Sequence, residues 1–158
     1  MLGGIRLKTI KRMLEHQIWA NSRLLAAVRQ SGGGSQELLR LFRHLAIAEQ
    51  VWITRLNGGT TAHLKLWAED MNLDEIEALL ASNGQQYMEY LAGLTEEQLD
   101  GDSTYANQSG VEFRTPIRDI LAHVALHGQY HRGQINRMLR EAGGEPQPLD
   151  FILFARNH

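Results

Sequence analysis

The sequence contains no cysteine among its 158 residues. Disulfide bonds and thiolate metal ligands are therefore excluded, and any transition-metal site must be built from histidine imidazoles and carboxylates. The absence of cysteine is also consistent with a reducing compartment.

Long apolar segments are missing as well. No stretch approaches the roughly 18 consecutive apolar residues of a membrane span, and the first residues lack the uninterrupted apolar segment of a signal peptide. The formal net charge is only −2, and acidic and basic residues are interleaved, so charge gives no reason to expect binding to nucleic acid or to an anionic membrane. We therefore expect a cytoplasmic protein with no nucleic-acid or membrane partner.

The composition that remains is that of an ordinary globular protein. Hydrophobic residues make up 43% of the chain and charged residues 22%, which excludes disordered, collagen-like and disulfide-scaffold classes. The length is typical of one domain with one core, so we expect a single domain over residues 1–158.

Apolar residues recur at helical spacing in four long segments, separated by glycine-rich or polar stretches. The predicted helices cover residues 5–30, 36–56, 72–94 and 116–142, with Ser35 as the N-cap of the second. Four long helices with mostly short connections predict an all-α four-helix bundle, in which a cofactor site is built by inward side chains of facing helices.

Two further segments complete the expected fold. Residues 103–115 alternate imperfectly around a Ser-Gly pair, which predicts a small two-stranded hairpin or an ordered loop before the last long helix. The C-terminal residues LDFILFARNH are apolar enough to pack against the bundle.

The last long helix contains three histidines at four-residue spacing, His123, His127 and His131, in the segment HVALHGQYHRGQ. The chain has seven histidines in 158 residues, and such a triplet is expected only about 0.01 times by chance. Residues four apart lie about 40° apart around a helix, so two imidazoles can converge on one ion. A helical wheel centres the apolar stripe near His131, with His127 next and His123 at the edge.

Buried neutral imidazoles need partners, because each ring carries a hydrogen-bond donor and an acceptor. A metal ion satisfies two rings at once, but a catalytic ion usually has three protein ligands and one open position. His44 is the best candidate for the third ligand, since it borders the apolar stripe of the second predicted helix. His16 and His63 are weaker candidates.

Four segments, spread over nearly the whole chain, are the basis for a comparison with a known family. They are HQIWANSRLL, RHLAIAEQVWITRLNG, STYANQSGVEFRTPIRDILAHVALHGQYHRGQINRML and GGEPQPLDFILF. In their sequence and order the chain resembles the DinB/YfiT-like family of metal-dependent four-helix-bundle proteins. That family's metal site takes one histidine from the second helix and two from an H-x-x-x-H-R-G-Q segment in the fourth. The resemblance implies His44, His127 and His131 as metal ligands here, and no position of the motif is missing.

The resemblance also implies a function class. Relatives include mycothiol-dependent isomerases and bacillithiol-type S-transferases, and members form homodimers. We therefore expect a homodimer that binds a divalent ion, with Zn²⁺ first and Ni²⁺ or another ion as alternatives, together with a small-molecule substrate and a low-molecular-weight thiol. The expected activity is transfer of the thiol to an electrophile, as in an S-transferase. Two alternatives stay open: a metal-dependent hydrolase, and a non-catalytic bundle that holds a metal or small ligand in a stress response.

Three residues near these ligands have plainer interpretations. We expect Glu49 to be a surface residue or an interhelical salt-bridge partner rather than a fourth ligand. Arg132 is expected in a structural ion pair rather than on a substrate carboxylate. His123 is expected to pack beside the site without ligating the ion.

The remaining expectations concern packing. Gly133 is expected to allow close contact between helices, and Gln134 to bond across helices. Trp19 and Trp52 are expected to be packing anchors rather than platforms for a substrate.

Overall fold

The computed structural model describes residues 4–158, so the first three residues of the expected domain lie outside the described part. Within it, all four predicted helices, the hairpin and a short C-terminal helix are present, which confirms the predicted all-α bundle with a small hairpin. The elements are α1 (Ile5–Gln30), α2 (Gln36–Leu56), α3 (Leu73–Ala92), the 3-10 turn η1 (Glu97–Asp100), β1 (Asp102–Ala106), β2 (Glu112–Pro116), α4 (Ile117–Glu141) and α5 (Phe151–Asn157).

The helices begin and end close to where local chemistry predicts. The Ser35 side chain accepts a hydrogen bond from the backbone N–H of Leu38 at 3.1 Å, and Asn72 forms a capping box with Glu75 at the start of α3. Both caps satisfy N–H groups that have no partner inside the helix. Pro116 precedes α4 as its N-cap and is also the last residue of β2, rather than lying in the first helical turn.

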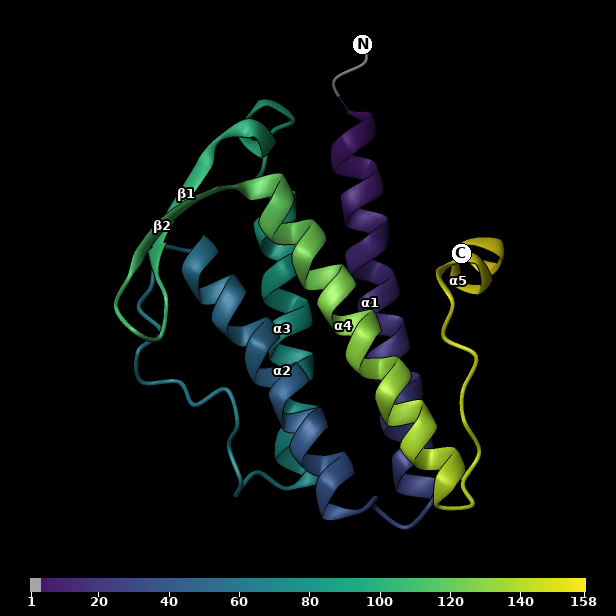
Figure 1. Ribbon diagram of the computed structural model, residues 1–158. Helices are drawn as coiled ribbons and strands as arrows, with labels where there is room; N and C mark the ends of the chain where they lie inside the picture. The colour runs from purple at the N-terminus through teal and green to yellow at the C-terminus, as the bar shows by residue number, and fades with distance from the viewer. Residues whose placement is uncertain (1–3) are drawn as a thin grey trace.

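The four long helices form two pairs of opposite direction. α1 and α4 run one way, and α2 and α3 run the other (Figure 1). α4 packs against α1 and α2, while α3 packs against the same two helices. Because α2 and α3 are parallel, the chain must return over the length of a helix, about 31 Å for 21 residues. Residues 57–72 make this return beside α2 (Figure 1).

The core consists of two apolar clusters that occupy different levels of the bundle. One contains side chains such as Leu24, Phe42 and Ile135, and the other contains side chains such as Leu14, Ile53 and Leu121. Between these levels lies a layer of buried polar side chains from all four long helices, namely Gln17, Asn21, Glu49, Asn83 and Arg132.

Within this polar layer, an asparagine joins two charged side chains. Arg132 donates from Nη1 to Oδ1 of Asn21 at 2.8 Å, and Asn21 donates from Nδ2 to Oε2 of Glu49 at 2.8 Å. Asn83 donates to the backbone carbonyl of Ala46 at 2.9 Å. Interhelical hydrogen bonds therefore hold four of the five side chains of this layer.

Both expectations for the charged members of this layer need correction. Glu49 is 4% exposed, so it is not a surface residue, and its interhelical partner is the Asn21 amide rather than a cation. Arg132 is fully buried and makes no ion pair with any described residue. Asn21 lies between the two charges, so they do not form a direct ion pair, and burial keeps Arg132 from the surface.

The close approach of helices occurs at Gly128 rather than at Gly133. A Cβ atom at Gly128 would lie 2.8 Å from Oε1 of Gln17 and 2.9 Å from Nη1 of Arg132. A Cβ atom at Gly133 would meet nothing within 4 Å. The expectation for Gly133 is wrong because Gly133 lies on the exposed side of α4.

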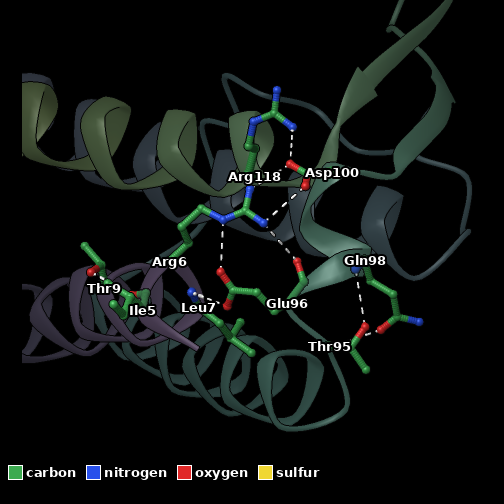
Figure 2. A network of polar contacts seen from close by, with 9 residues as sticks. All are labelled: Ile5, Arg6, Leu7, Thr9, Thr95, Glu96, Gln98, Asp100 and Arg118. Atoms are coloured by element: carbon green, nitrogen blue, oxygen red, sulfur yellow. Dashed lines mark hydrogen bonds and ion pairs between the residues drawn. The ribbon is translucent and has the colours of Figure 1, made fainter. Parts of the chain in front are cut away.

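At one end of the bundle, ion pairs join α1, η1 and α4 (Figure 2). Arg6 contacts Glu96 at 2.9 Å and Asp100 at 2.8 Å, and Arg118 reaches the same Asp100 carboxylate at 2.7 Å. The hydrogen bond from Arg6 is the largest cause that lowers the pKa of Asp100. This network ties the start of α1 to the segment that leads into the hairpin.

The hairpin pairs β1 with β2 in antiparallel register and packs against α2 and α4. The Tyr105 ring lies 5.1 Å from the ring of Trp52, and Trp52 packs against the second apolar cluster. The prediction that Trp52 is a packing residue is confirmed.

The C-terminal helix α5 packs against α1, as predicted for the apolar tail. Phe154 is 3% exposed, and its ring lies 5.8 Å from that of Trp19, which confirms Trp19 as a packing residue. Among residues 4–158, no helix combines the length and apolar character needed to cross a membrane.

Candidate metal centre

Three histidines from two helices converge at the contact between α2 and α4. His44 lies on α2, and His127 and His131 lie on α4. One ring nitrogen of each lies within 4.8 Å of the others, and the Nε2 atoms of His127 and His131 are 3.1 Å apart. The structure therefore brings together the three residues that the sequence indicated as ligands.

Two of these rings are oriented by hydrogen bonds through their other nitrogen. Nδ1 of His44 lies 3.0 Å from the carbonyl oxygen of Leu66. Nδ1 of His131 lies 2.7 Å from Oε1 of Gln134. Since both oxygens accept, Nδ1 carries the proton in each ring and Nε2 keeps a lone pair. Gln134 thus bonds within α4, and the expectation of a bond across helices is wrong.

Trp67, which sequence reasoning missed, covers one side of the cluster. Its ring stacks on His44 with centroids 3.8 Å apart and an interplanar angle of 7°. Trp67 reaches α2 from the loop of residues 57–72, and it is 46% exposed. A lone tryptophan in a polar loop was the only local signal, and nothing in its spacing indicated a contact with His44.

The histidines lie at the border of the buried stripe of α4, not at its centre. The buried positions of α4 include Val124, Gly128, Arg132 and Ile135, so the stripe is centred beyond His131 on the wheel. His127 and His131 are half-buried. The predicted centre was wrong because the helical wheel did not include four positions that the structure shows to be buried: Leu121, Gly128, Arg132 and Leu139. The cluster is consequently accessible from one side.

Burial favours the neutral form of two rings of the cluster, His127 and His44. Burial is the largest cause that lowers the pKa of His127 to about 4, and the neighbouring rings of His131, His44 and His123 lower it further. Burial is also the main cause that lowers the pKa of His44. Neutral imidazoles are the form that binds a metal ion.

The other histidines stand apart from this cluster. His123 has its ring 5.4 Å from that of Trp52 and 5.4 Å from that of His127, so it packs beside the site. His16 is buried with Nε2 2.7 Å from the carbonyl oxygen of Leu149, and His63 is exposed in the loop. Neither weaker candidate joins the three converging rings.

A cavity of about 550 Å³ lies beside His131. Its walls come mainly from the first half of α2, the second half of α4 and the loop residue Trp67. Apolar atoms of Leu41 and Met138 and the ring of Tyr130 contribute to the lining. The cluster therefore has a neighbouring space large enough for a small molecule.

The fold and the cluster together define a class of protein: a helix bundle with three converging histidines that are compatible with binding of a divalent ion between two helices. A sequence model of the DinB family matches residues 8–158, and the chain belongs to this family. Protein DinB of Bacillus subtilis (strain 168) is 28% identical to this chain over an alignment 159 residues long. The alignment covers 90% of this chain and 91% of the relative.

A solved structure supports the fold independently. The crystal structure of a DinB-like protein from Bacillus cereus ATCC 10987, at 2.01 Å resolution, is similar with a TM-score of 0.69 and 16% sequence identity. The likeness covers 89% of this chain and 95% of that chain. The two chains thus share the same bundle fold.

Proposed function

We propose that this protein is a divalent-metal-dependent enzyme that transfers a low-molecular-weight thiol to an electrophile. His44, His127 and His131 are the proposed metal ligands. The observation that carries the proposal is the convergence of one nitrogen from each ring within 4.8 Å, beside a cavity that can hold a small molecule.

The spacing and chemistry of the donors fit one ion. Two nitrogen ligands of a tetrahedral Zn²⁺, each at about 2.1 Å, lie roughly 3.4 Å apart. The Nε2 atoms of His127 and His131 are 3.1 Å apart, close to that value. Imidazole nitrogen also suits Zn²⁺ and Ni²⁺, so Zn²⁺ is the first proposed ion and Ni²⁺ the second.

The number of donors favours a catalytic site over a structural one. Within residues 4–158, the only converging group of histidine and acidic side chains that could hold an ion has three members, whereas structural zinc sites usually have four protein ligands. When bound, a divalent ion with one open position would lower the pKa of a thiol placed there. Leu66 and Gln134 hold the rings of His44 and His131 in the orientation that this requires.

Metal binding is tested by elemental analysis after loading with Zn²⁺ and dialysis. We expect about one ion per chain in the wild type and in His63→Ala, whose exposed loop histidine is outside the cluster, and loss of that ion in His127→Ala. Equal, negligible metal in all three proteins would show that the three rings do not form a metal site.

Thiol transfer is tested with the zinc-loaded protein, a model electrophile such as monobromobimane, and glutathione, bacillithiol or mycothiol in turn. We expect accelerated consumption of at least one thiol by the wild type and none by His127→Ala. If the loaded protein consumes no thiol but hydrolyses ester or amide substrates, the same ligands serve a hydrolase instead. If it does neither, a non-catalytic metal-binding bundle is the better account.

A further inference from the structure

Arg40 is linked to the candidate metal centre through Trp67. The guanidinium carbon of Arg40 lies 4.9 Å from the centre of the Trp67 ring, and the same ring stacks on His44 at 3.8 Å. Arg40 and His44 are one helical turn apart on α2. The cation–π contact therefore holds the guanidinium in the wall of the cavity that also contains His131.

The charges in this cavity are unevenly paired. Four lining residues are charged: Glu37, Arg40, Arg137 and Glu141. Arg137 contacts Glu141 at 2.9 Å, so these two charges offset each other. In the described part of the chain, no carboxylate lies within ion-pair distance of Arg40, and no cationic side chain lies within ion-pair distance of Glu37.

We propose that the cavity binds a small molecule with a carboxylate, which pairs with Arg40 while the rest of the molecule extends toward the three histidines. The planar guanidinium presents two parallel N–H groups that match a carboxylate. Trp67, Leu41 and Met138 provide the apolar wall for the body of the ligand. The carboxylate of Glu37, which also lines the cavity, opposes this pairing.

This inference concerns the ligand of the proposed thiol-transfer site. It depends on the proposed function only for the choice of a thiol as the reacting group of that ligand. The test compares N-acetyl-L-cysteine with N-acetyl-L-cysteine amide, which differ only in the carboxylate. Both are titrated calorimetrically into zinc-loaded protein at low ionic strength. Since Arg40 is exposed to solvent, we expect the wild type to bind the acid about two- to fivefold more tightly than the amide.

Two variants isolate the contribution of Arg40. Arg40→Gln should bind the acid and the amide equally, with its metal content and circular dichroism spectrum unchanged. Arg140→Gln removes the same charge from an exposed position of α4 outside this cavity, and it should keep the preference. Glu37→Gln should strengthen binding of the acid about twofold, because it removes the opposing charge.

A second titration separates this proposal from the proposed function. S-methyl-N-acetyl-L-cysteine and its amide are titrated into metal-free protein, where neither a thiol nor an ion takes part, and the acid should still be preferred. Equal binding of acid and amide by the wild type, binding of neither at millimolar concentration, or an unchanged preference in Arg40→Gln would each overturn the carboxylate site. A carboxylate preference without any thiol transfer would overturn the proposed activity alone.

Discussion

Gly128 and Gly133 both lie within α4, away from its ends, but their surroundings have opposite consequences for stability. Gly128 faces Gln17 and Arg132, whose side chains are buried in the polar layer and cannot move into solvent. Gly133 faces open space. The glycine there therefore affects stability only through its backbone, which has more conformational freedom to lose when the helix folds than that of another residue.

These surroundings predict changes of opposite sign. Gly128→Ala should lower the free energy of unfolding by about 1–3 kcal/mol, because the added methyl group crowds the buried side chains of Gln17 and Arg132. Gly133→Ala should raise it by about 0.5–1 kcal/mol through helix propensity. Urea denaturation of both variants measures the two values. A stabilising Gly128→Ala would mean that Gln17 and Arg132 can rearrange freely.

At the level of single helices, α2 links the candidate metal centre to the neighbouring cavity. It carries His44 and Arg40. The glycine-rich turn before it is flexible and does not by itself determine where the helix begins. The Ser35 side chain therefore has a clear role, since it accepts from the Leu38 N–H and defines the first turn.

Removal of this cap should loosen the start of α2. Ser35→Ala should lower the free energy of unfolding by about 1 kcal/mol, whereas Ser35→Asp should keep the stability because aspartate caps equally well. Thermal and urea unfolding measure the difference. The cap would have no role if both substitutions had the same effect.

For the molecule as a whole, the polar layer between the two apolar clusters carries an electrostatic cost, because it buries the ionisable side chains of Glu49 and Arg132. Burial is the main cause that raises the pKa of Glu49 to about 7, while the hydrogen bond from Asn21 and the charge of Arg132 oppose the increase. A carboxyl group whose pKa is higher in the folded state binds its proton more tightly there than in the unfolded chain.

The sign of the resulting pH dependence follows from this. The contribution of Glu49 to stability is fully present below pH 4.5, and it is lost as the pH rises to about 7. The loss is at most about 3 kcal/mol. Glu49→Gln should remove this decline, as measured by urea unfolding of metal-free protein over that pH range. Parallel pH profiles for wild type and variant would show that Glu49 is already ionised throughout.

Much of the fold follows from local chemistry. Ser35 and Asn72 cap helices because short polar side chains satisfy the first free N–H groups, and glycines interrupt the apolar periodicity between them. The identity of the three histidines was also predictable, because four-residue spacing places His127 and His131 on one side of a helix, and the motif of a known family indicated His44.

Other features depend on contacts between residues far apart in the chain. Whether Arg132 faces solvent or the core depends on Asn21, which lies 111 positions away. For the same reason Gly128 rather than Gly133 is the close contact, and Trp67 stacks on His44 only because the parallel arrangement of α2 and α3 returns the loop along α2. Periodicity reports which side of a helix is apolar, but only the packed bundle determines which polar groups find partners inside it.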